Sequence, residues 1–575
     1  MAAPEHKVSL IPLKLLKSDR SDRELEAWQR DYGIDYATLL GDQVAAPALD
    51  LTHHVLEVNT DKSLGLAPGQ FTIRLYDARI KGKFYNEIIE ANDLVLLKLN
   101  GGELNNPFVN VMLGVVARIS KQTRISGDHT AHFVEIHGMD CAQWLYWNVN
   151  FFWAYAGIGA DAKGGIRELQ QRIEIWKFLF PNSGQPDLSS AKVLENILLR
   201  YIGAISPRVG ELFQFVPVAT LSKQAKFKSD DPVLGLGERY VPEKDLSAHS
   251  GSVATLLEEY KMDYLSEIWS DTTDDGGFAI YYRRPPYDEA DWFGFNESSG
   301  QAFATRVLHS ISDSEITGGN VGRAIDTYFN FISVLPWVYG DDAIARLVMN
   351  SGLRLDASSI KDRGLRLLHI TQRYLDYNAT GETTIVRPTG DFNEMVAEGL
   401  ISAGPMRGSI PTTKLAAFVS RAIAEGEVFG PKTTRLMSMV DHWADTLWRW
   451  YSQLDRYYSG RMTLKGRPSI RVGHKVHLKC ETGKWFNEPY EFYVAAVGHD
   501  YDVQRGSYLT SLVLTRGQRA AGFIQPVTDG KEDFFSLNAE KKKGQFSNQQ
   551  KLSKTPFGTV AVVEVFRERD FKPTL

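Results

Sequence analysis

The stretch Phe71-Thr72-Ile73-Arg74-Leu75 alternates apolar and polar side chains. In an extended chain successive side chains point to opposite faces, so Phe71, Ile73 and Leu75 share one face. The pattern therefore predicts a β-strand with one buried face.

Further strands are expected on both sides of this stretch, within residues 51–140. Residues 93–99 are apolar on both faces, residues 108–113 and 114–119 follow the pair Gly101-Gly102, and residues 132–137 end at Gly138. Glycine, asparagine and aspartate separate these runs. Short strands at this spacing predict an antiparallel barrel or sandwich.

A second β-rich segment is expected near the C-terminus. Residues 462–464, 475–479, 490–497 and 508–516 read as four strands separated by glycine turns. Two helices, 412–426 and 433–458, precede them. The apolar stripe of the longer helix consists of Leu436, Val440, Trp443, Leu447, Trp450, Leu454 and Tyr457.

The region between the two β-rich segments favours mixed structure. Helices are predicted over 166–180 and 190–205, because apolar residues recur at three- and four-residue steps and prolines follow. Residues 212–249 are loop-like, and 264–286 predict a β-hairpin that turns at Asp274-Asp275-Gly276-Gly277. Shorter helices are expected around 323–331 and 342–350.

These patterns predict an α+β multidomain chain, since 575 residues exceed what a single core supports. The first fifty residues read as an arm that docks on a neighbour, with a short helix around 24–32. Residues 531–553 read as a linker, followed by a last strand over 559–566. The expected divisions are an arm (1–50), a first β-domain (51–140), a helical or mixed outward domain (141–250), a mixed region (251–410), a helix with a second β-domain (411–517), and a linker with a tail strand (518–575).

Composition excludes several classes of protein. The chain is 43% hydrophobic and 23% charged, and its net charge of −5 is too negative for a dedicated nucleic-acid binder. Cys141 and Cys480 are the only cysteines, so neither a disulfide framework nor a structural zinc site is expected, and a reducing assembly compartment fits best. The N-terminus lacks the pattern of a signal peptide, and no apolar run is long enough for a membrane span.

The two β-rich segments resemble the baseplate hub proteins of tailed bacteriophages and their relatives, the type VI secretion spike proteins and the tail proteins of defective prophages. Together the matching stretches cover about a third of the chain. In the first segment they are 70–73, 92–97, 113–119 and 134–140, where a strand, an Asp-led strand, a Gly-led strand and a closing Gly-x-Asp follow in that order. In the second they are 466–476, with a Gly-x-Pro turn, 492–500 and 508–514, and the hairpin end 277–286 is similar to a weaker family feature.

This resemblance implies two tube-like antiparallel β-barrel domains with helical and mixed domains inserted between them. Three chains would then place six similar barrels around an axis and join a hexameric tail tube or distal tail protein to a trimeric central spike. The implied protein is a non-catalytic homotrimer that lines the channel for genome ejection in the virion baseplate. It would be assembled in the bacterial cytoplasm and could also contact baseplate wedge and tape-measure proteins.

Candidate chemical sites are explained better by structure than by function. The run Asp271-Thr272-Thr273-Asp274-Asp275-Gly276 is similar to a calcium loop, but Tyr282 stands where a bidentate glutamate is required, so a turn is predicted. His132 and His137 are five apart on a strand and fall on opposite faces, which excludes a zinc-protease pair. The glycines of 157–165 lack the order of a phosphate loop.

The remaining candidates also favour packing or solvation. His53, His54, His474 and His499 have no partner spacing of a metal site. Trp443, Trp450 and Tyr457 could form a sugar-stacking platform, but their helical spacing favours a core or subunit interface. Lys541–Lys543 reads as a solvated part of a linker. We therefore expect no catalytic, cofactor-binding or metal-binding residue.

Two other classes of function remain open on the sequence. A tail-associated peptidoglycan hydrolase could place paired carboxylates among the 70 acidic residues, and a zymogram would detect its activity. A receptor- or carbohydrate-binding tail protein would bind cell envelope as an isolated trimer, and a glycan pull-down would detect it.

Overall fold

The structure is a computed structural model of the whole chain. It describes residues 3–16, 22–33, 35–39, 44–102, 107–126, 129–147, 149–151, 207–217, 250–283, 308–323, 328–338, 352–376 and 431–520, together with a few short pieces between them.

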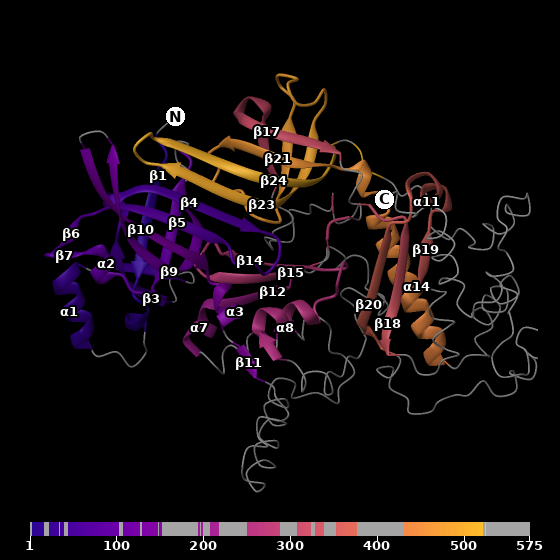
Figure 1. The fold of residues 1–575 in the computed structure, drawn as a ribbon, viewed down its shortest axis with the longest axis horizontal. Helices are drawn as coiled ribbons and strands as arrows, with labels where there is room; N and C mark the ends of the chain where they lie inside the picture. Colours follow the sequence, from indigo (N-terminus) through magenta and orange to yellow (C-terminus); the bar gives the residue numbers. More distant parts are fainter. Residues whose placement is uncertain are drawn as a thin grey trace, which may run out of the picture.

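The described residues form an α+β protein dominated by antiparallel β-structure, as the sequence predicts. One large sheet has the path β17-β21-β24-β23-β4-β5-β10-β9-β8-β1-β3-β2, with β22 and β16 attached beside β23. In Figure 1 the indigo and violet strands of this sheet lie beside its orange and yellow strands. Within the described residues the path has open ends at β2 and β17, so it does not close into a barrel.

Five strands make up what we call the first unit. They come from the β-rich segment around Phe71 and pair in the order β4-β5-β10-β9-β8. Their bounds are β4 (Val55–Ser63), β5 (Gln70–Tyr76), β8 (Leu94–Asn100), β9 (Val109–Ser126) and β10 (His129–Asp140).

Five other strands form the second unit and pair in the order β17-β21-β24-β23-β22. Their bounds are β17 (Ile316–Arg323), β21 (Tyr458–Lys465), β22 (Lys475–Lys479), β23 (Tyr490–Asp502) and β24 (Ser507–Arg519). Taken in chain order, the strands of the two units have the same neighbours. The two units therefore share one topology, with β4 equivalent to β17 and β9 equivalent to β23, although β17 comes from the region that the sequence reading placed between the two β-rich segments.

The irregularities of the ladders repeat as well. Ala117 is the extra residue where β9 bulges against β10, and Ala495 is the extra residue where β23 bulges against β24. Leu56 is the extra residue between β4 and β5, and Thr317 is the extra residue between β17 and β21. A bulge re-aims a strand at a defined point, so matching bulges give both units the same local bends.

The chain also enters the third strand of each unit, β8 or β22, in the same way. Asn92 has a positive φ of 74° and Gly473 a positive φ of 84°. Asn92 N–H donates to the Val116 carbonyl at 2.8 Å, and Gly473 N–H donates to the Val494 carbonyl at 2.9 Å. Glycine and asparagine are the residues that adopt this left-handed conformation at least cost, which explains why either can serve.

Three strands from the N-terminal region extend the large sheet, which the sequence reading missed. β1 (Glu5–Ile11) pairs with β8 along its whole length, and β3 (Val44–Asp50) and β2 (Asp35–Leu39) follow. The end of β1 is buried on both faces, so its sequence lacks the alternation that marks a half-buried strand. The short helix was predicted correctly as α1 (Asp22–Tyr32).

Smaller elements occupy the middle of the chain. The predicted hairpin consists of β14 (Glu267–Thr272) and β15 (Phe278–Arg283), and β12 (Phe213–Pro217) pairs parallel to β15. A second small sheet has the order β19-β18-β20. The remaining bounds are β6 (Arg79–Ile80), β7 (Lys83–Phe84), β11 (Val149–Phe151), β13 (Ser250–Ser252), β16 (Leu308–Ser312), β18 (Phe331–Val338), β19 (Leu353–Leu355), β20 (Leu367–Asp376), α2 (Tyr85–Ile88), α3 (Gln143–Trp147), α7 (Pro207–Leu212), α8 (Val253–Tyr260), α11 (Ala357–Arg363) and α14 (Pro431–Tyr451).

Several predicted elements need correction. The two strands expected over 108–119 are one long strand, β9, because the glycine at 114 packs under Phe71 and does not turn the chain. The helix expected around 323–331 is wrong, since Arg323 ends β17 and Phe331 begins β18. Residues 213–217 form a strand, not a loop. The long helix ends at Tyr451, and the predicted elements over 166–180, 342–350, 412–426, 531–553 and 559–566, and most of 190–205, lie outside the described residues.

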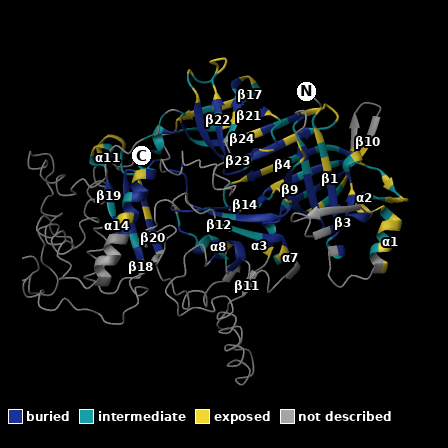
Figure 2. Cartoon of the chain, turned by 180° about the vertical axis from the view of Figure 1, so that it is seen from behind, coloured by how far each residue is buried: buried dark blue, intermediate teal, exposed yellow. Residues whose placement is uncertain are grey.

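Apolar side chains gather into separate clusters beneath the two units, and Figure 2 shows buried residues alternating with exposed ones along strands of both units. Ile73 and Ile136 belong to the core of the first unit, and their equivalents Met462 and Leu512 belong to the core of the second. Each fully buried side chain of this size contributes roughly 1.5–3 kcal/mol to stability. Within the described parts of the chain, no helix combines the length and the hydrophobicity needed to span a membrane.

Candidate functional site at the junction of the two units

The two units are joined edge to edge by strands that are far apart in sequence. β4 of the first unit pairs antiparallel with the C-terminal half of β23 in the second, from Ala496 opposite Ser63 to Asp502 opposite Glu57. The junction makes one continuous sheet out of both units. We call this pairing the internal junction.

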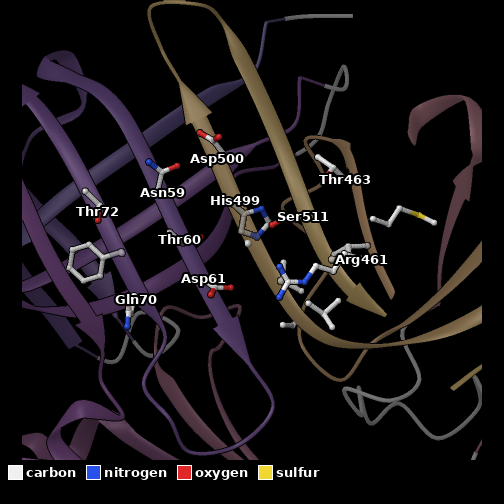
Figure 3. Close-up of a pocket in the computed structure, with 17 residues that line it drawn as sticks. Asn59, Thr60, Asp61, Gln70, Thr72, Arg461, Thr463, His499, Asp500 and Ser511 are labelled. Atoms are coloured by element: carbon white, nitrogen blue, oxygen red, sulfur yellow. The ribbon is translucent and has the colours of Figure 1, made fainter. Parts of the chain in front are cut away.

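One face of the internal junction is hollow and polar. The hollow has a volume of about 690 Å³ and is formed by β4, β5, β21, β23 and β24, as Figure 3 shows. Because side chains alternate along a strand, the residues between them, such as Val58 and Lys62, are buried on the other face. The polar side chains labelled around the hollow include Asn59, Asp61, Gln70, Thr72, Arg461, Thr463, Asp500 and Ser511.

Carboxylates cluster along the junction on this hollow face. Glu57 and Asp502 are directly opposite each other, and Asp500 is opposite Asn59. Partial burial raises the pKa of Asp500, and the neighbouring carboxylates of Glu57 and Asp502 raise it further. Arginines lie beside these carboxylates, since Arg74 pairs with Glu57, Arg505 lies 3.4 Å from Asp502, and Arg461 lines the hollow.

The opposite face of the junction contains a buried ion pair. Lys62 Nζ lies 2.6 Å from Asp271 Oδ1 and 3.1 Å from Thr272 Oγ1, and the side chains of Lys62 and Asp271 are 8% and 5% exposed. Burial alone would raise the pKa of Asp271, but Lys62 and Arg471 hold it below its usual value. The pair connects β4 to the β14–β15 hairpin.

Arg471 connects the same hairpin to the second unit. Its guanidinium lies 2.6 Å from Asp274 Oδ1, and it also donates to the carbonyls of Thr272 and Asn110. Both units are therefore held to the hairpin by charged groups. Breaking a pair of this kind is costly, because it leaves a buried charge without a partner.

Asp140, which closes the first β-rich segment, lies fully buried beside this network. Its Oδ2 accepts a hydrogen bond from Ser270 at 3.2 Å, and its Oδ1 accepts one from the Ala142 N–H at 3.0 Å. Burial raises the pKa of Asp140 to about 6, although Lys62 opposes the shift. The Gly-x-Asp ending thus fixes the strand against the hairpin.

A second buried cluster ties β24 and β23 to the base of the hairpin. Glu267 Oε1 lies 2.6 Å from Arg516 Nη2, and Glu267 Oε2 accepts a hydrogen bond from Tyr493 at 2.7 Å. Arg283 lies 3.4 Å from the same carboxylate. Burial would raise the pKa of Glu267, but the two arginines outweigh it and the pKa is lowered.

The candidate chemical motifs adopt structural roles. The turn at 271–276 is closed by a Thr273 N–H bond to the Gly277 carbonyl at 3.0 Å, and Asp271 is committed to Lys62. His474 Nδ1 lies 2.9 Å from His309 Nε2, and His499 Nδ1 lies 3.0 Å from the Tyr508 hydroxyl. No group of three or more potential metal-ligating side chains occurs among the described residues.

The aromatic candidates lie in the core. Trp443, Trp450 and Tyr457 are 0%, 1% and 6% exposed, so they present no sugar-stacking surface and the prediction of packing is confirmed. His54 contacts the Tyr85 hydroxyl, and His137 lies 3.1 Å from both Thr72 and Glu135. The glycines of 157–165 and the lysines of 541–543 lie outside the described residues.

The residues that form the internal junction were not singled out from the sequence. Lys62 carried one usable signal, since it occupies an inward position in an alternating strand. Its partner Asp271 is more than two hundred residues away. No local pattern could have paired them.

Comparison with known proteins finds similarity in structure alone. No protein-family model matches the chain, and no curated protein matches it. Similar solved structures include a tail protein from Neisseria meningitidis MC58, with 11% identity, a TM-score of 0.38, and coverage of 84% of this chain and 97% of that one. The 43 kDa tail protein of prophage MuSo2 from Shewanella oneidensis has 10% identity, a TM-score of 0.35 and coverage of 84% and 95%.

A third similar structure is an Escherichia coli component of the type VI secretion system, described as similar to bacteriophage T4 tail proteins. It has 8% identity, a TM-score of 0.32 and coverage of 83% of this chain and 78% of that one. The similar structures are thus of the kind that the sequence resemblance predicts. Because these TM-scores are below 0.5, conclusions about function rest on the geometry of this chain.

Proposed function

We propose that this protein is a structural baseplate hub of a phage tail, in which three copies surround the tail axis. Each chain contributes two similar units, so a trimer presents six of them in a ring with pseudo-sixfold symmetry. Such a ring can meet a hexameric tail tube, or a distal tail protein, on one side and a trimeric central spike on the other. Each unit, with its neighbouring strands, would form one tube-like barrel domain.

The repeated topology carries this proposal. The two units share their strand order and the positions of two bulges, and in each a residue with positive φ precedes the third strand. They have no obvious sequence repeat. A second copy of a fold within one chain is the feature that a threefold-to-sixfold adaptor requires.

The hollow polar face supports a channel-lining role for the internal junction. Polar side chains such as those of Asn59, Thr72 and Ser511 line it together with apolar ones, and carboxylates lie along the pairing of β4 with β23. A channel that releases a genome should not retain phosphates, so weak attraction is the property that such a lining needs. The ring would pass nucleic acid without binding it specifically.

The rest of the chain would serve assembly. The parts of 141–250 and 251–410 that lie outside the large sheet and the β14–β15 hairpin would form outward domains that contact wedge or tape-measure proteins, whereas β1, β2, β3, β16 and β17 belong to the sheet. The protein would have no catalytic role or cofactor and would reside in the baseplate of the virion tail.

Light scattering coupled to size-exclusion chromatography tests the proposal. The full chain should elute with three times the monomer mass of 64.6 kDa. A monomer that persists at high concentration would contradict it. A clearing zone in a peptidoglycan zymogram would instead favour the hydrolase.

A further inference from the structure

The repeated topology assigns a partner to two strand edges that have no strand partner among the residues the structure describes. At the internal junction, β4 pairs with the C-terminal half of β23. Their equivalents are β17 in the second unit and the C-terminal half of β9 in the first. Among the described residues, β17 pairs only with β21, and β9 pairs with β8 only through residues 109–115.

We propose that β17 of one copy of this chain pairs antiparallel with the C-terminal half of β9 of a second copy, and that this pairing reproduces the internal junction. The inference rests on the proposed ring of three chains. It adds which edges meet and in which register. We call this pairing the external junction.

The register follows from equivalent residues. Ala117 and Ala495 occupy the same bulge, which makes Gln122 the equivalent of Asp500, five residues further along each strand. Leu56 and Thr317 occupy the other shared bulge, which makes Asn320 the equivalent of Asn59.

Asp500 is opposite Asn59 at the internal junction. Gln122 should therefore be opposite Asn320 of the next copy. In the same way, Ser120 is the equivalent of Gly498 and Gly322 the equivalent of Asp61, so these two residues should also be opposite each other. Since side chains alternate along a strand, a slip of one residue would move every side chain to the wrong face, so the register is a strict prediction.

The chemistry of both edges suits this pairing. β17 has the sequence Ile-Thr-Gly-Gly-Asn-Val-Gly-Arg, with a largely exposed burial pattern and only one charged residue. It lacks the lysines and prolines with which proteins usually protect a free edge. On β9, Ala117, Arg118, Lys121 and Thr123 are exposed. The β9 edge does carry Arg118 and Lys121, and Lys121 is paired with Asp77 at 2.7 Å. Two edges without a strand partner among the described residues are the ingredients of strand addition.

The polar face would also continue across the external junction. Asn59 and Asp500 face the hollow at the internal junction. Gln122 and Asn320 are their equivalents and are likewise polar. The same kind of lining would thus run through six junctions in a ring of three chains.

Disulfide trapping of the full-length protein tests the register. In a chain with Cys480→Ser, the substitutions Gln122→Cys and Asn320→Cys should cross-link under mild oxidation, because directly opposite residues in a β-ladder bring their Cα atoms within disulfide range. Cys141 is buried and can remain. On a non-reducing gel the double variant should give covalent species up to the trimer, and a mixture of the two single variants should give dimers only.

A matched control uses Lys121→Cys with Asn320→Cys. These side chains would point to opposite faces, so the control should cross-link roughly tenfold less than the Gln122 pair. Stronger cross-linking of the control would show a one-residue slip and overturn the register. Absence of cross-links in a protein that light scattering shows to be a trimer would overturn the external junction alone, whereas a monomer would overturn the hub proposal as well.

Discussion

Lys62 shows how one residue can connect distant parts of the chain. It lies in β4, its ammonium group is buried against Asp271 of the hairpin, and its strand pairs with β23. A lysine with 8% side-chain exposure is stable in such a place only because its charge is matched. The internal junction therefore depends on an ion pair behind it as well as on the backbone ladder.

Replacing Lys62 should destabilise the protein far more than replacing an exposed lysine. Lys62→Met leaves the carboxylate of Asp271 without its closest partner and should lower the free energy of unfolding by about 3–5 kcal/mol. Lys14→Met removes an ion pair of the same length with Glu90 at the surface and should cost less than about 1 kcal/mol. Urea unfolding followed by circular dichroism measures both, and equal losses would disprove the role of the buried pair.

Buried histidines should make the second unit sensitive to acid. Burial, with Lys62 and Arg471, lowers the pKa of His499 from 6.5 to about 3. The folded protein keeps His499 neutral while the unfolded chain takes up a proton below pH 6.5. Stability that is present above this pH is therefore lost as the pH falls toward 3.

Between pH 7 and pH 5, His499 alone should cost about 2 kcal/mol of unfolding free energy. The variant His499→Gln keeps a side chain that can hydrogen-bond Tyr508 and does not titrate, so it should lose that much less over the same range. Denaturation curves at the two pH values give the difference. Equal pH dependence of variant and wild type would show that His499 is protonated in the folded state.

At the scale of elements, the two units fill one equivalent core position in different ways. In the first unit Phe71 of β5 is opposite Gly138 of β10. At the equivalent place in the second unit, Gly460 of β21 is opposite Leu514 of β24. One large and one small residue fill the position in both cases, but the strands that supply them are exchanged.

This exchange predicts that Gly138 cannot be enlarged. A Cβ atom there would overlap the ring of Phe71 and the carbonyl of Val115, so Gly138→Ala should cost about 1–3 kcal/mol of stability through overpacking. Gly318→Ala in β17 meets no atom within 4 Å and is the matched control. Thermal melting should separate the two variants, and similar melting temperatures would contradict the packing.

Such compensation explains what the sequence could and could not predict. The strand at Phe71 and the strands over 475–516 were predicted because their patterns alternate or end at glycines. β1 was missed because it is buried on both faces, and the helix expected around 323–331 was wrong because neighbouring strands outweighed local periodicity. At equivalent positions such as Asn92 and Gly473, or Phe71 and Gly460, the two units have different residue types. A sequence comparison therefore cannot detect that these positions correspond.

At the scale of the whole molecule, the internal junction would define the geometry of the proposed ring. It already joins two equivalent units within one chain, so a ring needs only the same contact between chains. The charged groups behind the junction would keep the angle between the two units fixed. The polar face would turn toward the axis of the ring. The ion pair, the bulges and the repeated topology thus serve one proposed architecture.

Electron cryo-microscopy of the purified full chain tests that architecture most directly. Particles should show three copies around an open axis, with six similar units in the ring and the face that carries Asn59 and Asp500 toward the lumen. Particles of a single copy, or a ring in which only one unit of each chain borders the axis, would contradict the account.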